Sequence, residues 1–102
     1  MNYFLKDQEN IYIGIRITTD KGIKDLNKKY LKRDYTTDVL SFEIKEILQD
    51  PEKTFYLGDV VVNKEQAERQ AAEYENDIQH EIAELVEHGV LHLLGIHHEG
   101  DE

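Results

Sequence analysis

The sequence predicts a single α+β domain, a small mixed β-sheet with helices packed on one side of it. The chain has 102 residues, which is too few to build two separate hydrophobic cores. Three segments have the apolar pattern of strands and three have that of amphipathic helices. Their order is strand, helix, strand, strand, helix, helix. Since this does not alternate as a doubly wound fold would, an α+β arrangement fits better.

The first two elements are a strand and a helix. Residues 11–18 place four isoleucines at alternate positions, which predicts a half-buried strand. Thr19 or Asp20 can cap the helix that follows, because a short side chain with an oxygen accepts from the free N–H groups of the first turn. This helix is expected over about residues 21–31, with an apolar stripe of Ile23, Leu26 and Tyr30.

Two further strands are expected in the middle of the chain. Residues 39–44 alternate again, with Leu40, Phe42 and Ile44 on one face. The segment 45–56 holds the only proline and is expected to form a loop. Residues 57–62 are dense in valine, which predicts a third strand at the centre of the sheet.

The last third of the chain is expected to be helical. Asn63 and Gln66 have the spacing of a capping box that opens a helix extending to about Tyr74. The pair at 76–77 (Asn-Asp) then caps a longer helix over about residues 78–94. Its core-facing stripe consists of Ile78, Ile82, Leu85, Val86 and Leu93.

Composition excludes several classes of protein. There is no cysteine, so disulfides, thiolate metal sites and cysteine nucleophiles are ruled out. No apolar run reaches the ~18–20 residues that a membrane span needs. The first ten residues also lack the unbroken apolar stretch of a signal peptide. These features suit a cytoplasmic protein with no membrane partner.

The charge is unevenly distributed along the chain. The formal net charge is −10, which alone argues against a nucleic-acid partner. Residues 21–33, however, carry six basic side chains and one acid. This run is either a solvated helix face or a patch that faces phosphate groups on an otherwise acidic protein. Charge does not choose between these two interpretations.

Histidines near the end of the last helix predict a metal site there. His88 and His92 are four residues apart, so their imidazoles stand one above the other on the helix. Gly95 ends the helix and tolerates the left-handed turn that can bring His98 back toward them. His97 is a rival third ligand. Three imidazoles with an open fourth position are typical of catalytic zinc.

The remaining histidine, His80, lies two turns before His88 and is too far along the helix axis to share its metal ion. We interpret it as a surface residue. Its neighbours Glu81 and Glu84 are likewise expected to be solvated.

The residues around these histidines resemble the YbeY endoribonuclease family. The resemblance rests on three motifs in the family's order, at 37–42 (TDVLSF), 57–60 (LGDV) and 88–99 (HGVLHLLGIHHE). It extends from about Ile15 to Glu99.

This resemblance implies a single YbeY-like domain over residues 1–102, shorter than usual at both ends. It implies a bacterial, cytoplasmic, zinc-dependent endoribonuclease that is specific for single strands and acts in ribosomal RNA maturation. The expected mechanism is metal-activated hydrolysis of RNA phosphodiesters or metal-assisted attack by an RNA 2′-OH, and the sequence does not separate the two. His88, His92 and His98 are then the ligands of one zinc ion. The implied partners are a ribosomal RNA precursor and proteins of the ribosomal subunit.

Four residues are candidates for contacts with the RNA: Lys29, Lys32, Arg33 and Ser41. The family usually has an arginine where this chain has Leu31, and Lys32 or Arg33 is the candidate replacement. A lysine would not reproduce the bidentate geometry of a guanidinium.

Two other functions stay open. One is a non-catalytic ribosome-assembly or protein-binding module with a vestigial metal site, which Leu31 and the short ends favour. The other is a metalloprotease, because the histidine spacing matches the metzincin signature, in which a glutamate follows the first histidine as general base. Gly89 occupies that position here, so peptide hydrolysis lacks its usual proton acceptor. A small residue at this place instead permits close packing on a neighbouring element.

Overall fold

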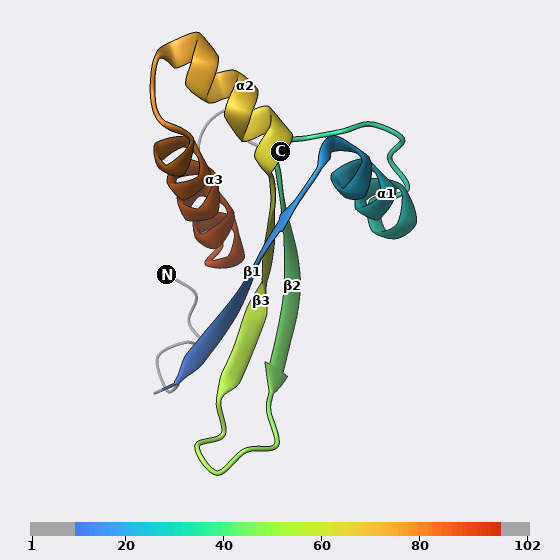
Figure 1. Cartoon of the computed structure of the whole chain (residues 1–102). Helices are drawn as coiled ribbons and strands as arrows, with labels where there is room; N and C mark the ends of the chain where they lie inside the picture. Colours follow the sequence, from blue (N-terminus) through green and yellow to red (C-terminus); the bar gives the residue numbers. More distant parts are fainter. Residues whose placement is uncertain (1–9, 97–102) are drawn as a thin grey trace.

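The computed structural model describes residues 10–96 and has an α+β architecture, as the sequence predicts (Figure 1). Three strands form one sheet, and three helices pack against it. The elements in chain order are β1 (Ile11–Thr18), α1 (Asp20–Leu31), β2 (Val39–Ile47), β3 (Phe55–Asn63), α2 (Lys64–Tyr74) and α3 (Ile78–Leu93). Within the described part of the chain, no helix is both long enough and apolar enough to cross a membrane.

The sheet is mixed, with β3 at its centre, which confirms the prediction from the valine-rich segment. The strand order is β1-β3-β2. β1 runs parallel to β3, and β2 runs antiparallel to it. The side chains of Leu57, Val60 and Val62 on β3 are completely buried, as expected for a strand with a neighbour on each side.

Helices cover both faces of the sheet, so the expectation that they lie on one side is wrong. Val60 and Val62 pack in a core cluster with Leu85 and Leu93 of α3. Val61 packs in a second cluster with Ile23 of α1 and Leu40. Successive side chains of a strand point to opposite faces. The two helices therefore lie on opposite sides of β3, as Figure 1 shows.

The hairpin between β2 and β3 is longer than predicted. β2 continues to Ile47, three residues beyond the expected end, and β3 begins at Phe55. The register shifts between Glu43 and Glu46, and Lys45 within this irregularity has a positive φ of 53°. An irregularity of this kind interrupts the alternation of side chains. The predicted pattern therefore ends before the strand does.

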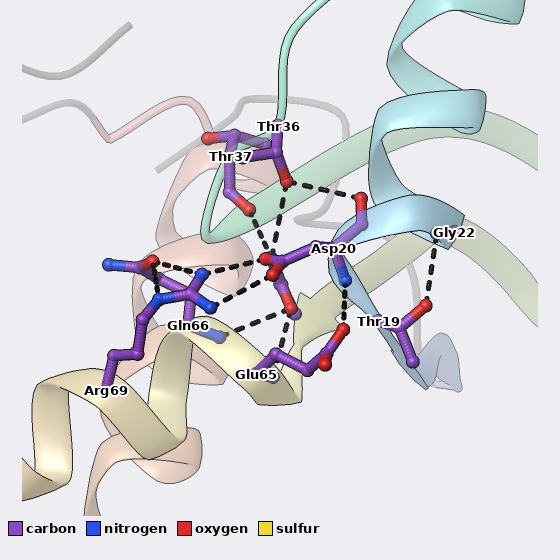
Figure 2. Close-up of polar contacts among 9 residues, drawn as sticks. Thr19, Asp20, Gly22, Thr36, Thr37, Glu65, Gln66 and Arg69 are labelled. Carbon is purple, nitrogen blue, oxygen red and sulfur yellow. Dashed lines mark hydrogen bonds and ion pairs between the residues drawn. The ribbon is translucent and has the colours of Figure 1, made fainter.

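A polar network holds the starts of α1 and α2 together (Figure 2). Asn63 is completely buried and caps α2 by accepting from the backbone N–H groups of Glu65 and Gln66. Its side-chain amide donates to Asp20 at 2.6 Å and to the carbonyl of Thr37 at 3.1 Å. Asn63 is thus an asparagine cap and not a capping box, because its own backbone N–H donates to the carbonyl of Asp38 instead of the Gln66 side chain.

Asp20 is the charged centre of this network. Its carboxylate accepts from both terminal nitrogens of Arg69, at 2.8 and 2.9 Å. Hydrogen bonds from Arg69 and then from Asn63 lower the pKa of Asp20 to about 2. The helix α1 begins at Asp20 and is capped by Thr19, whose hydroxyl accepts from the N–H of Gly22. Of the two candidate caps, the structure therefore uses Thr19.

Candidate metal centre on the last helix

Local signals in the sequence fix both ends of α3. The Asp77 side chain caps the helix by accepting from the N–H of His80 at 2.7 Å. The helix ends at Leu93, and Gly95 follows with a φ of +81°. This is the left-handed turn that was predicted to terminate the helix.

The structure brings His88 and His92 together on one face of α3. Their ring centroids are 5.1 Å apart, and the ring planes are tilted by 31°. Both side chains are half-buried. His97 and His98 lie outside the described residues, so the third ligand stays a prediction.

Two imidazoles one helical turn apart could bind one transition-metal ion. Imidazole nitrogen is a preferred ligand of zinc, at about 2.0–2.1 Å from the ion. The helix holds the two rings one turn apart, so little side-chain freedom has to be lost when they bind the same ion.

Gly89 explains why this turn of α3 lies so close to the sheet. A Cβ atom at position 89 would lie 2.5 Å from Cγ1 of Val60 and 3.1 Å from Oγ of Ser41. The hydroxyl of Ser41 donates to the carbonyl of Gly89 at 2.9 Å. The close packing that the small residue was predicted to permit is therefore confirmed, and it ties the histidine-bearing turn to β2 and β3.

Ser41 itself is placed against the helix. A serine hydroxyl has one hydrogen to donate, and here that hydrogen bonds the Gly89 carbonyl. What Ser41 can still offer to a ligand is an acceptor lone pair.

A second group of possible metal ligands occupies the first turns of α3. His80, Glu81 and Glu84 each have a ligand atom within 4.8 Å of the others, so this group could hold a metal ion. Two of these side chains already contact each other, with His80 Nε2 3.1 Å from Glu84 Oε1. Exposed pairs one helical turn apart commonly form without any metal.

Glu81 is buried, with 5% of its surface exposed, so its predicted solvation is wrong. The side-chain amide of Asn76 donates to its carboxylate at 2.9 Å, which supplies the partner that a buried charge requires. The signal was present in the spacing, because Glu81 is three residues after Ile78 and four before Leu85 and therefore falls on the apolar stripe.

The basic candidates lie on α1 and just beyond it, away from the histidines. Lys29, Lys32 and Arg33 are all exposed. Lys32 adopts a left-handed conformation with φ 56° and ends the helix. The backbone N–H groups of Lys32 and Arg33 both donate to the carbonyl of Asn27. Because α1 and α3 cover opposite faces of the sheet, the structure does not bring these side chains beside His88 and His92.

Comparison with known proteins agrees with this fold and these motifs. A family model described as Endoribonuclease YbeY matches residues 1–102. The protein named Endoribonuclease YbeY from Aquifex aeolicus is 43% identical over 90 residues, which cover 88% of this chain and 58% of that protein. Its namesake from Pelotomaculum thermopropionicum is 45% identical over 96 residues, covering 92% of this chain and 63% of that protein. The chain thus spans about three fifths of the length of these curated relatives.

One solved structure shares the architecture. The solution structure of TM1509 from Thermotoga maritima superposes with a TM-score of 0.59 at 29% sequence identity. The match covers 91% of this chain and 57% of that one. Taken with the match of the family model to the whole sequence, these relatives show that the chain belongs to the YbeY family.

Proposed function

We propose that this protein is a zinc-dependent endoribonuclease that hydrolyses phosphodiester bonds of single-stranded RNA during ribosomal RNA maturation. The observation that carries the proposal is the pair of adjacent imidazoles, His88 and His92, on the last helix of a YbeY-family chain. The curated relatives are named as endoribonucleases, which supports the same reaction class here.

In this proposal His88, His92 and His98 hold one zinc ion. When bound, zinc lowers the pKa of a water ligand and offsets charge that develops on a phosphate oxygen. The protein's own part is to hold the imidazoles in place. Asp77 starts their helix, and Gly89 sets it against β2 and β3.

The exposed cations at the end of α1 supply the grip on the RNA backbone. Lys29, Lys32 and Arg33 are exposed residues, which phosphates of the RNA can reach. Contacts between basic side chains and the phosphates of the RNA give affinity without sequence preference. A ribosomal RNA precursor is the proposed substrate, ribosomal subunit proteins are the proposed further partners, and the cytoplasm is the proposed location.

The proposal is tested by comparing His92→Ala with His80→Ala. The two variants lose the same side chain from the same helix, but only His92 belongs to the proposed centre. Zinc per chain, measured by mass spectrometry after dialysis, should fall to background in His92→Ala and stay near that of the wild type in His80→Ala. Cleavage of a single-stranded RNA should follow the zinc content.

The opposite pattern, with zinc lost only in His80→Ala, would move the metal to the His80, Glu81 and Glu84 group. Zinc bound by the wild type with no RNA cleavage would instead support a non-catalytic module. Circular dichroism of both variants checks that neither result reflects unfolding.

A further inference from the structure

A pocket lies between α1 and the sheet, on the face opposite the histidines. Its volume is about 330 Å³, and it is lined by Arg16, Leu26, Tyr30, Phe42, Asp59 and Val61. These residues come from all three strands and from α1.

The apolar part of the pocket is aromatic. The rings of Tyr30 and Phe42 meet edge to face, with centroids 5.7 Å apart and planes at 70°. Leu26 and the buried Val61 belong to the core cluster at this face. Tyr30 remains 58% exposed, so a ligand in the pocket can reach this residue from solvent.

The polar part is a paired acid and base. Asp59 accepts a hydrogen bond from the hydroxyl of Tyr56 through Oδ1, while its Oδ2 lies 3.9 Å from Nη2 of Arg16. The side chain of Asp59 is 13% exposed and that of Arg16 is 71% exposed. Gly14 on β1 is paired with Asp59 on the neighbouring strand β3. The glycine leaves room for this carboxylate, because a Cβ at position 14 would collide with it.

Tyr56 keeps the carboxylate oriented. The hydrogen bond to Asp59, together with burial, raises the pKa of Tyr56 to about 12. The phenol is therefore protonated and donates to Oδ1 throughout the neutral range. This leaves Oδ2 as the oxygen on the Arg16 side.

We propose that this pocket binds one unpaired base of the RNA, and this inference rests on the proposed function. The ring would stack against Tyr30, and its edge would be hydrogen-bonded by Asp59 and Arg16. Every nucleobase edge offers a donor beside an acceptor, which a carboxylate next to a guanidinium can satisfy. Stacking on an aromatic side chain tolerates all four bases.

Charge around the pocket favours a nucleotide over a peptide. Lys29 Nζ lies 5.2 Å from the centroid of the Tyr30 ring, and Arg16 is at the other side of the pocket. Cations beside an aromatic surface match the alternation of base and phosphate along a single strand. A base held here lies across the sheet from His88 and His92. It would therefore position the strand and take no part in bond breaking.

The test measures binding of a short 2′-O-methyl RNA strand, which cannot use a 2′-OH as nucleophile, in the presence of a chelator. A second strand has the same sugar-phosphate backbone with no bases. The wild type should bind the strand with bases roughly 5- to 150-fold more tightly, the range expected for one stacked base. Tyr30→Ala should bring this ratio close to one, and Tyr30→Phe should preserve it.

Tyr74→Ala is the matched control, since Tyr74 is a similarly exposed tyrosine on α2, outside the pocket. It should keep the wild-type ratio. Equal binding of both strands by the wild type would overturn the proposal, as would an unchanged ratio in Tyr30→Ala. Failure of the proposed function would give a different result. The zinc-loaded wild type would then not cleave ordinary RNA, although the chelated protein would still bind the strand with bases more tightly.

Discussion

Helices α1 and α3 pack on opposite faces of the same central strand, and they do so in different ways. α3 buries residues at four-residue intervals: Glu81, Leu85, Gly89 and Leu93. α1 buries only Ile23 and Asn27 and turns its lysines to solvent. The buried glycine sets α3 close to the sheet, whereas α1 presents charge. The rigid helix therefore suits ligands that must meet at one ion, and the exposed helix suits contacts with a flexible polyanion.

The variant expected to distinguish the two helices most strongly is one that removes charge at the end of α1. The triple variant Lys29→Ala, Lys32→Ala, Arg33→Ala should bind single-stranded RNA more than ~10-fold more weakly at low salt. The log–log dependence of binding on salt should become shallower by about 0.7 for each phosphate that the variant no longer neutralises. Its zinc content should equal that of the wild type.

Fluorescence anisotropy across a salt series checks this prediction, with Lys64→Ala on α2 as a control for charge alone. An unchanged salt slope in the triple variant would mean that the basic run is only a solvated surface. Loss of zinc in that variant would mean that the two helices are not independent.

A smaller effect is expected from Gly89→Ala on α3. The added methyl would meet Val60, a completely buried and stiff side chain on the central strand. Overpacking of this kind costs about 1–3 kcal/mol, which outweighs the ~0.5–1 kcal/mol that alanine gains over glycine within a helix. Urea unfolding measures the difference.

The control for this variant is Gln79→Ala at an exposed position of the same helix, where a change within about 0.5 kcal/mol is expected. If Gly89→Ala proved as stable as the wild type, the helix would not be set against Val60 as described.

The smallest effects should come from the two N-caps, where the helices are alike. Thr19→Ala on α1 and Asp77→Ala on α3 each remove a side chain that accepts from the first turn. Each should lower the free energy of unfolding by about 1 kcal/mol. Asp77→Asn should recover most of that loss, because asparagine is an equally good cap. A loss in only one of the two alanine variants would show that the helices also differ in how they begin.

The local features of this fold were predictable, because they depend on short stretches of sequence. The limits of β1 follow from its alternating isoleucines, and the start of α3 follows from Asp77. The central place of β3 follows from its valines. The pairing of His88 with His92 follows from helical spacing alone.

Features that depend on distant parts of the chain were not predictable. The extension of β2 depends on an irregularity at Lys45 that breaks the period of two. α1 lies on the face away from α3 because it packs on Val61, whereas α3 packs on Val60 and Val62.

The network around Asp20 has a consequence for behaviour in acid. The pKa of Asp20 is about 2 in the folded protein, against an ordinary value of 3.8, so its contribution to stability is complete above pH ~4 and is lost as the pH falls toward ~2. The melting temperature of the wild type should therefore exceed that of Asp20→Asn at neutral pH, and the gap should close over this interval. Because one carboxylate joins the beginnings of α1 and α2, its protonation would weaken the contact between the two helices in a single step.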